Sequence, residues 1–128
     1  MKSTLITGGA GFVGSNLANA LLAAGHPVTI FDSLVRPGTE QNLQWLRQLH
    51  PETLSFIMAD VRDADAVAAA STEVDMIYHL AGQVAVTTSV ENPRSDFEVN
   101  ALGSFNVLES ARASGRRPIV VFTSTNKV

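Results

Sequence analysis

Short runs of apolar residues alternate along the chain with longer stretches in which apolar positions recur every three or four residues. The short runs have the length of buried strands, and the longer stretches have the period of helices. This alternation predicts βαβ units around a parallel sheet. We expect five strands, at 3–7, 28–31, 54–58, 76–80 and 119–123.

Four helices are expected between these strands. The first spans 12–24 and ends at Gly25, with Val13, Leu17, Leu21 and Ala24 on one face. The second lies around 41–49. The third spans 64–70, with Asp63 as the N-cap.

The longest predicted helix begins near Pro93 and ends at Gly115. Phe97, Ala101, Leu108 and Ala111 fall on one face at helical spacing. Further apolar residues lie off that face, namely Val99, Leu102 and Val107. They predict a second buried surface, either against another subunit of a homo-oligomer or against a further part of the same chain.

Right-handed crossovers turn this element order into an α/β fold with a Rossmann-type doubly wound parallel sheet, incomplete at about five strands in the order 3-2-1-4-5. Ligands of such sheets bind outside the carboxyl ends of the strands, near the switch in strand order. Five residues that close or follow the strands are therefore expected to converge there: Thr7, Asp32, Asp60, Ala81 and Thr123.

A glycine-rich turn joins the first strand to the first helix. We expect Gly8 to permit the tight turn, Gly11 to let a pyrophosphate approach the backbone, and Gly14 to let the helix pack closely. The free N–H groups that open the helix, together with its dipole, favour a phosphate there. A strand before the turn and a helix after it distinguish this pattern from an isolated glycine triplet, so it predicts a dinucleotide site.

Asp32 closes the second predicted strand, where a carboxylate would hydrogen-bond the adenosine ribose hydroxyls. The same charge would repel a 2′-phosphate, so NAD is favoured over NADP. Arg36 is the nearby cation that leaves NADP open.

The composition mainly excludes certain classes of partner and site. A chain of 128 residues with 45% hydrophobic residues and a net charge of −3 predicts one globular domain whose main partner is neither nucleic acid nor a membrane surface. The chain has no cysteine and no apolar leader after Met1, which suits a cytoplasmic location. The three histidines lack metal-ligand spacing, so no metal site is expected and His79 is interpreted as a satisfied core residue.

Six segments carry a family resemblance. In chain order they are Thr-Gly-Gly-Ala-Gly-Phe-Val-Gly at 7–14, Phe-Asp at 31–32, Ala-Asp-Val at 59–61, His-Leu-Ala-Gly at 79–82, Asn-Ala-Leu-Gly at 100–103 and Thr-Ser-Thr-Asn-Lys-Val at 123–128. Taken together they resemble the extended short-chain dehydrogenases, specifically the NAD-dependent sugar-nucleotide epimerase/dehydratase family. The resemblance covers the whole chain.

The resemblance implies a role for each matching residue. The glycine turn would hold the pyrophosphate, Asp32 and Ser33 the adenosine ribose, and Asp60 with Val61 the adenine. The NAD-binding set so implied is Gly8, Gly11, Phe12, Val13, Gly14, Asp32, Ser33, Asp60, Val61, Leu80, Ala81, Gly82, Gln83, Asn100 and Thr123. The implied catalytic residue is Thr125, and the implied substrate-binding set is Gln83, Val84, Thr87 and Thr88. A solvated polar loop is the alternative for the run at 87–89.

Residues 81–89 and 124–128 resemble those of family members that epimerise CDP-linked deoxyhexoses at C2. A nucleotide sugar is thus the implied substrate, and lipopolysaccharide biosynthesis the implied setting. A 4-epimerase, a 4,6-dehydratase and a catalytically silent NAD-binding module remain open.

The family's Tyr-x-x-x-Lys pair has no match in the chain. Its only tyrosine is Tyr78, within a predicted strand and with Gly82 four places on. We therefore expect residues 1–128 to be the N-terminal part of an NAD-binding Rossmann domain. The catalytic Tyr and Lys and the C-terminal substrate-binding part would lie beyond Val128, and these residues alone would be inactive.

Overall fold

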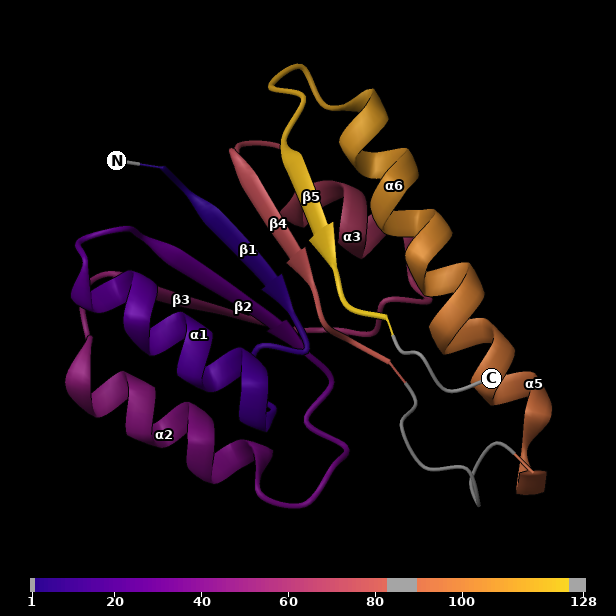
Figure 1. The fold of residues 1–128 in the computed structure, drawn as a ribbon, viewed down its shortest axis with the longest axis horizontal. Coiled ribbons are helices and arrows are strands. Elements are labelled where there is room, and N and C mark those ends of the chain that lie inside the picture. Colours follow the sequence, from indigo (N-terminus) through magenta and orange to yellow (C-terminus); the bar gives the residue numbers. More distant parts are fainter. Residues whose placement is uncertain (1, 83–89, 125–128) are drawn as a thin grey trace.

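A computed structural model describes residues 2–82 and 90–124. Five strands form one parallel sheet in the order β3-β2-β1-β4-β5 (Figure 1). They are β1 (Thr4–Thr7), β2 (Val28–Asp32), β3 (Leu54–Met58), β4 (Met76–His79) and β5 (Ile119–Phe122). The predicted doubly wound sheet and its strand order are confirmed, and the strand ends agree to within one residue.

Helices cover both faces of the sheet (Figure 1). The described helices are α1 (Phe12–Ala23), α2 (Thr39–Leu49), α3 (Ala64–Ala70), α5 (Pro93–Phe97) and α6 (Gly103–Ala113), with a π-helical turn, η1 (Glu98–Leu102), between the last two. The Asp63 side chain accepts a hydrogen bond from the Ala66 N–H at 3.2 Å, which confirms it as the N-cap of α3.

Each layer of helices closes its own apolar core. On one side of the sheet, α1 and α2 pack on β1 and β2 through Ile6, Ile30, Leu22, Leu43 and Leu46. On the other side, α3 and α6 pack on the sheet through Leu5, Phe31, Ile77, Val67 and Val107. Consecutive residues of β1 are buried on opposite faces, as expected for a central parallel strand.

The predicted face of α1 is confirmed in part: Leu17 and Leu21 pack against the core, whereas Val13 and Ala24 are exposed. Val13 is 60% exposed, while Gly14, Ala18 and Leu22 are buried. Small side chains let the helix approach the sheet closely, so they occupy the contact line although they are less hydrophobic than their neighbours.

The longest predicted helix is interrupted, and its predicted face is confirmed only at Ala111, which is buried in the core. Phe97 and Leu108 are 65% and 54% exposed, whereas Gly103 and Val107 face the core and Val99 packs against it. The π turn η1 separates α5 from α6, and the small residue Gly103 packs against Val61, in the segment that follows β3. Close packing again selects small residues over large apolar ones.

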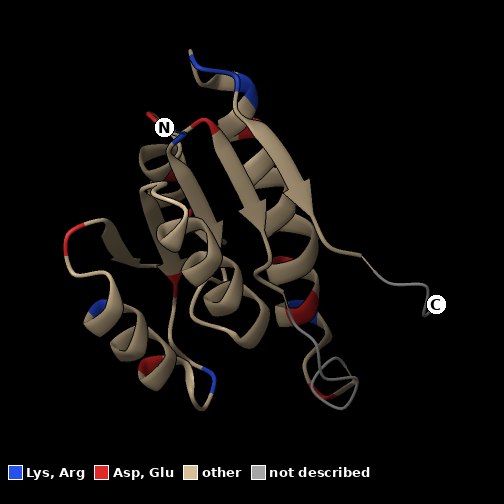
Figure 2. Cartoon of the chain, turned by 60° about the vertical axis from the view of Figure 1, so that its left-hand side comes forward, with Lys and Arg blue, Asp and Glu red and all other residues tan. Residues whose placement is uncertain are grey.

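Charged residues avoid the strands (Figure 2). The one exception in the five strands is Asp32, the last residue of β2. A carboxylate at the carboxyl end of strands that otherwise carry no Asp, Glu, Lys or Arg is consistent with a polar ligand at that end.

Candidate functional site

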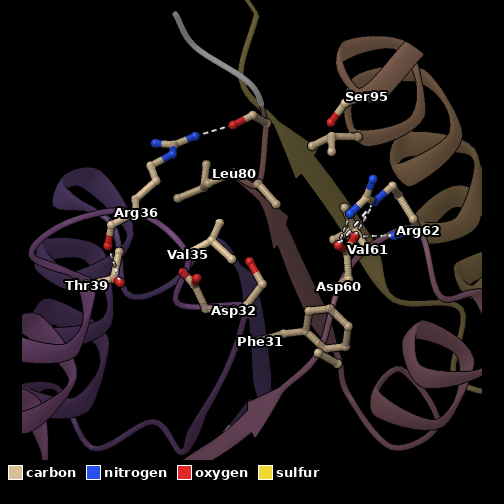
Figure 3. Close-up of a pocket in the computed structure, with 17 residues that line it drawn as sticks. Phe31, Asp32, Val35, Arg36, Thr39, Asp60, Val61, Arg62, Leu80 and Ser95 are labelled. Atoms are coloured by element: carbon tan, nitrogen blue, oxygen red, sulfur yellow. Dashed lines mark hydrogen bonds and ion pairs between the residues drawn. The ribbon is translucent and has the colours of Figure 1, made fainter. Parts of the chain in front are cut away.

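The carboxyl ends of β1, β2, β3 and β4 open onto a cavity of about 200 Å³ (Figure 3). Since all strands are parallel, the segments that follow them meet at this one edge. The cavity is lined by several residues of the implied NAD-binding set: Gly8, Gly11, Asp32, Ser33, Asp60, Val61, Leu80, Ala81 and Gly82.

The three glycines of the turn meet different surroundings. Gly8 has a left-handed φ of +69°, and a Cβ there would lie 2.8 Å from the Ala81 nitrogen. A Cβ on Gly14 would lie 2.4 Å from the Gly8 carbonyl oxygen. A Cβ on Gly11 would contact only that oxygen, at 3.3 Å, and Gly11 lines the cavity. Packing therefore requires glycine at 8 and 14, whereas glycine at 11 keeps the cavity open.

Helix α1 points its N-terminus at this cavity without a side-chain cap, because its N-cap residue is Gly11. The first N–H groups of a helix have no intrahelical acceptor and carry the positive end of its dipole. This arrangement fits a diphosphate. The side chains of Phe12 and Val13 are 82% and 60% exposed, so only their backbone N–H groups suit such a role.

The Asp32 carboxylate organises the loops beside it. Its Oδ2 accepts the Ala10 N–H at 3.0 Å, and its Oδ1 accepts the Leu34 N–H at 2.9 Å. Asn42 on α2 donates its Nδ2–H to the Ala10 carbonyl at 2.8 Å, which completes the support of the glycine turn. Leu34 adopts a left-handed φ of 60°, a conformation that costs about 1–2 kcal/mol. The hydrogen bond to Asp32 helps to hold it.

Arg36 connects two segments that line the cavity. Its guanidinium donates a hydrogen bond to the Gly82 carbonyl, joining the loop after β2 to the segment after β4 (Figure 3). Arg36 therefore lies on the same side of the cavity as Asp32.

A buried hydrogen-bond chain runs from β1 to the π turn. The Thr7 hydroxyl oxygen accepts the N–H groups of Leu80 and Ala81 at 3.1 and 3.2 Å, so its own proton is directed to His79 Nδ1 at 2.6 Å. Ser104 donates its hydroxyl to the Asn100 carbonyl at 2.6 Å, so it accepts the His79 Nε2–H at 3.1 Å. The donors thus select the neutral Nε2–H tautomer. Burial also lowers the pKa of His79, which favours the same neutral form of the ring.

Asp60 and Arg62 form a chelated pair on the wall opposite Asp32 (Figure 3). Asp60 Oδ1 accepts the Arg62 main-chain N–H at 2.9 Å and the Nε–H at 3.1 Å, while Oδ2 accepts the Nη2–H at 2.7 Å. Hydrogen bonding from the Arg62 side chain holds the pKa of Asp60 below its usual range, although burial opposes the effect.

The π turn and α6 support this wall from behind. The buried Asn106 side chain donates to the Val61 carbonyl at 2.8 Å, and a Cβ on Gly103 would lie 2.7 Å from Val61 Cγ2. Asn100 donates to Asp96 Oδ1 at 3.1 Å, and its Oδ1 would lie 3.1 Å from a Cβ at Gly82. Asn100 is thus beside the cavity, although it is not one of the residues that line it.

The remaining implied residues fall elsewhere. Thr123 is exposed after β5, and the cavity lining does not include it. Five implied residues lie outside the described part of the chain, namely Gln83, Val84, Thr87, Thr88 and Thr125. The roles assigned to all of the implied residues stay predictions.

The sequence interpretation missed Arg62, Ser95 and Val99, which also line the cavity. An arginine two residues after the strand-end Asp60 was an available signal. Ser95 and Val99 had none, because only the packing of α5 and η1 brings them to the strand ends. His79 is confirmed as a satisfied core residue.

Among residues 2–82 and 90–124, no helix has the length and apolar character required to cross a membrane, and no cluster of His, Asp and Glu side chains is arranged to hold a metal ion.

Parallel strands in the order 3-2-1-4-5, with a cavity outside their carboxyl ends, define a Rossmann-type α/β fold. A model of the family described as GDP-mannose 4,6 dehydratase matches residues 5–128. The chain belongs to this family, and the resemblance to sugar-nucleotide epimerases and dehydratases is confirmed.

Relatives agree with this membership. The chain is 44% identical over 126 residues to CDP-paratose 2-epimerase from Salmonella typhi, covering 97% of this chain and 37% of that protein. It is 39% identical over 126 residues to UDP-glucose 4-epimerase from Mycolicibacterium smegmatis, covering 98% and 39%. The chain therefore spans well under half the length of these relatives.

A solved structure agrees in fold. The UDP-glucose-4-epimerase from Stenotrophomonas maltophila, with bound NAD and formylated UDP-arabinopyranose, superposes with a TM-score of 0.85 at 30% identity. The match covers all of this chain and 38% of that one.

Proposed function

We propose that the chain is the NAD-binding Rossmann part of a nucleotide-sugar epimerase of the CDP-paratose (CDP-tyvelose) 2-epimerase type. The observation that carries the cofactor assignment is the uncapped N-terminus of α1 beside the Asp32 carboxylate, in one cavity at the strand ends. NAD in the solved relative supports it. The 44% identity to CDP-paratose 2-epimerase supports a CDP-linked deoxyhexose as substrate.

When bound, NAD would supply reversible hydride transfer to and from a sugar carbon. The chain's own residues would bind and orient this cofactor. The α1 N–H groups would hold the diphosphate, and Asp32 would hydrogen-bond the adenosine ribose. The Thr7 hydroxyl, which also bonds His79, fixes the backbone N–H groups of Leu80 and Ala81 beside the cavity, where these residues would line the nicotinamide part of NAD. Thr125 is proposed to hydrogen-bond the sugar oxygen, with an acid/base Tyr and Lys supplied by the rest of the protein.

Replacing Gly11 with valine tests the cofactor assignment. We expect Gly11→Val to weaken NAD binding by at least about tenfold, or ~1.4 kcal/mol, in isothermal titration calorimetry. The added side chain would project from a residue that lines the cavity, and its Cβ would have only the Gly8 carbonyl oxygen within 4 Å. Gly115→Val is the matched control, because a Cβ there has no atom within 4 Å. Unchanged NAD affinity in Gly11→Val with an unchanged melting temperature would refute this placement of the cofactor.

Substrate assays of the intact protein test the reaction. We expect turnover of CDP-paratose, and no turnover of UDP-glucose or dTDP-glucose. The 39% identity to a UDP-glucose 4-epimerase supports a 4-epimerase as the second candidate, which turnover of UDP-glucose alone would favour. NAD binding without turnover of any of the three would favour a silent NAD-binding module. A cytoplasmic location, a homo-oligomer and a role in lipopolysaccharide biosynthesis stay predictions.

A further inference from the structure

Arg62 occupies most of the hydrogen-bonding capacity of the Asp60 carboxylate. Its main-chain N–H, Nε–H and Nη2–H all donate to that group, at 2.7–3.1 Å. A carboxylate offers roughly four acceptor positions, so three donors fix its plane and leave about one position for a ligand. A group held in this way stays an acceptor and cannot rotate freely.

The pair is itself anchored. Arg62 Nη1 lies 3.8 Å from Glu98 Oε1 in the π turn η1. Both partners are partly exposed, so this ion pair contributes little to folding stability, but it limits where the guanidinium lies. The neighbouring Val61 carbonyl is held by the buried Asn106 amide at 2.8 Å. The segment from Asp60 to Arg62 is therefore fixed from the helical side.

The position of the Asp60–Arg62 pair in the cavity determines which part of a bound ligand it can contact. Asp32 and Arg36 lie on one wall of the cavity, while Asp60 and Arg62 lie on the other, with Leu80 between them (Figure 3). Asp32 and Asp60 line the same cavity, so a dinucleotide whose adenosine ribose lies at Asp32 would have the Asp60 carboxylate available to its base. An ionised carboxylate accepts a hydrogen bond from an amino group and repels a carbonyl oxygen in the same place.

We propose that Arg62 is a positioning residue for recognition of the base. It holds the Asp60 carboxylate so that the cavity selects a dinucleotide whose purine carries a 6-amino group over one with a 6-oxo group. The proposal deepens the cofactor assignment above and rests on it.

The test compares two cofactors that differ only at that position, NAD and nicotinamide hypoxanthine dinucleotide. Intact protein freed of bound nucleotide is titrated with each in a calorimeter. We expect the wild type to prefer NAD by about tenfold or more, the range expected for one hydrogen bond to a charged group. Arg62→Met should weaken NAD binding by a similar factor and leave the affinity for the hypoxanthine analogue nearly unchanged, so that the preference disappears.

Arg62→Lys should recover part of the preference, because an ammonium can pair with Asp60 but cannot donate in the fork geometry of a guanidinium. Arg112→Met is the matched control. Arg112 also pairs with a neighbouring carboxylate, that of Glu109 on α6, and is outside the cavity lining. It should keep the wild-type preference.

Two outcomes would overturn the role of Arg62. One is tight NAD binding by Arg62→Met with the wild-type preference intact. The other is an equal loss of affinity for both cofactors, which would indicate a structural or general charge effect. Melting temperatures of all variants identify a folding defect. A wild-type protein that binds neither dinucleotide, or a Gly11→Val variant that binds NAD normally, would instead refute the underlying cofactor site.

Discussion

At the scale of single residues, His79 shows how a polar group can be buried at the strand ends. It is 6% exposed, and both ring nitrogens have partners, Thr7 and Ser104. The sequence pattern placed His79 in the core, but it could not supply the partners. Thr7 is 72 residues away and Ser104 is 25 away, so only the folded chain brings them together.

The burial of His79 predicts a pH dependence of stability. Burial lowers the pKa of the folded-state His79 below the ordinary value of 6.5, so below about pH 6.5 the unfolded chain binds a proton that the folded chain does not. The free energy of unfolding contributed by neutral His79 is fully present above that pH. It should fall by up to about 1.4 kcal/mol per pH unit as the pH drops towards the folded-state pKa.

Urea unfolding of the wild type and of His79→Gln between pH 7.5 and 5 measures this contribution. The variant cannot take up this proton, so its stability should depend less steeply on pH than that of the wild type. Identical slopes for the two proteins would show that His79 does not carry the effect.

At the scale of elements, strands were predicted better than helix faces. The strands are short apolar runs whose type is set locally, and their limits agreed within one residue. The predicted faces of α1 and α6 were right at Leu17, Leu21 and Ala111 but wrong at Val13, Phe97 and Leu108. Close packing instead buried Gly14, Ala18 and Gly103. The π turn η1 also has no signal in a 3.6-residue period.

Gly103→Ala tests that contact. The new Cβ would overlap Val61 Cγ2, and crowding of this kind costs about 1–3 kcal/mol of unfolding free energy. The better helix propensity of alanine offsets at most ~1 kcal/mol, so we expect a net loss of stability in urea unfolding.

The matched control is Gly115→Ala, where no atom lies within 4 Å of the added Cβ. The double variant Gly103→Ala/Val61→Ala should lose less unfolding free energy than the sum of the losses in the two single variants, because shortening Val61 makes room for the methyl group added at position 103. Strict additivity of the two changes would argue against a direct clash.

At the scale of the whole molecule, one end of the sheet leaves apolar side chains exposed. β5 is an edge strand, and Ile119 and Val121 are 55% and 41% exposed on it. On the adjacent α6, Phe105 and Leu108 are 60% and 54% exposed. The spacing of apolar residues in the sequence predicted a second apolar surface on the long helix. The structure changes which residues form it, since Val99 and Val107 belong to the core instead.

Exposed apolar edges favour self-association, so we expect the 128-residue chain to form oligomers at high protein concentration in analytical ultracentrifugation. Val121→Lys should reduce this association, because it places a charge on the edge strand. Leu49→Lys is the control: it places the same charge on an exposed apolar residue at the end of α2, away from the edge strand. A chain that stays monomeric throughout, or an equal effect of both variants, would contradict this interpretation of β5.

The sequence by itself determined the order of strands and helices, the sheet order, the glycine turn and the acidic residue that closes β2. These features depend on short-range periodicity, on the backbone freedom of glycine and on general rules of connection handedness. Only the tertiary structure decided which helix faces are buried, which residues complete the hydrogen-bond chain of His79, and that Glu98 anchors the Asp60 and Arg62 pair. Those partners are far apart in the chain, and their meeting depends on how closely the helices pack on the sheet.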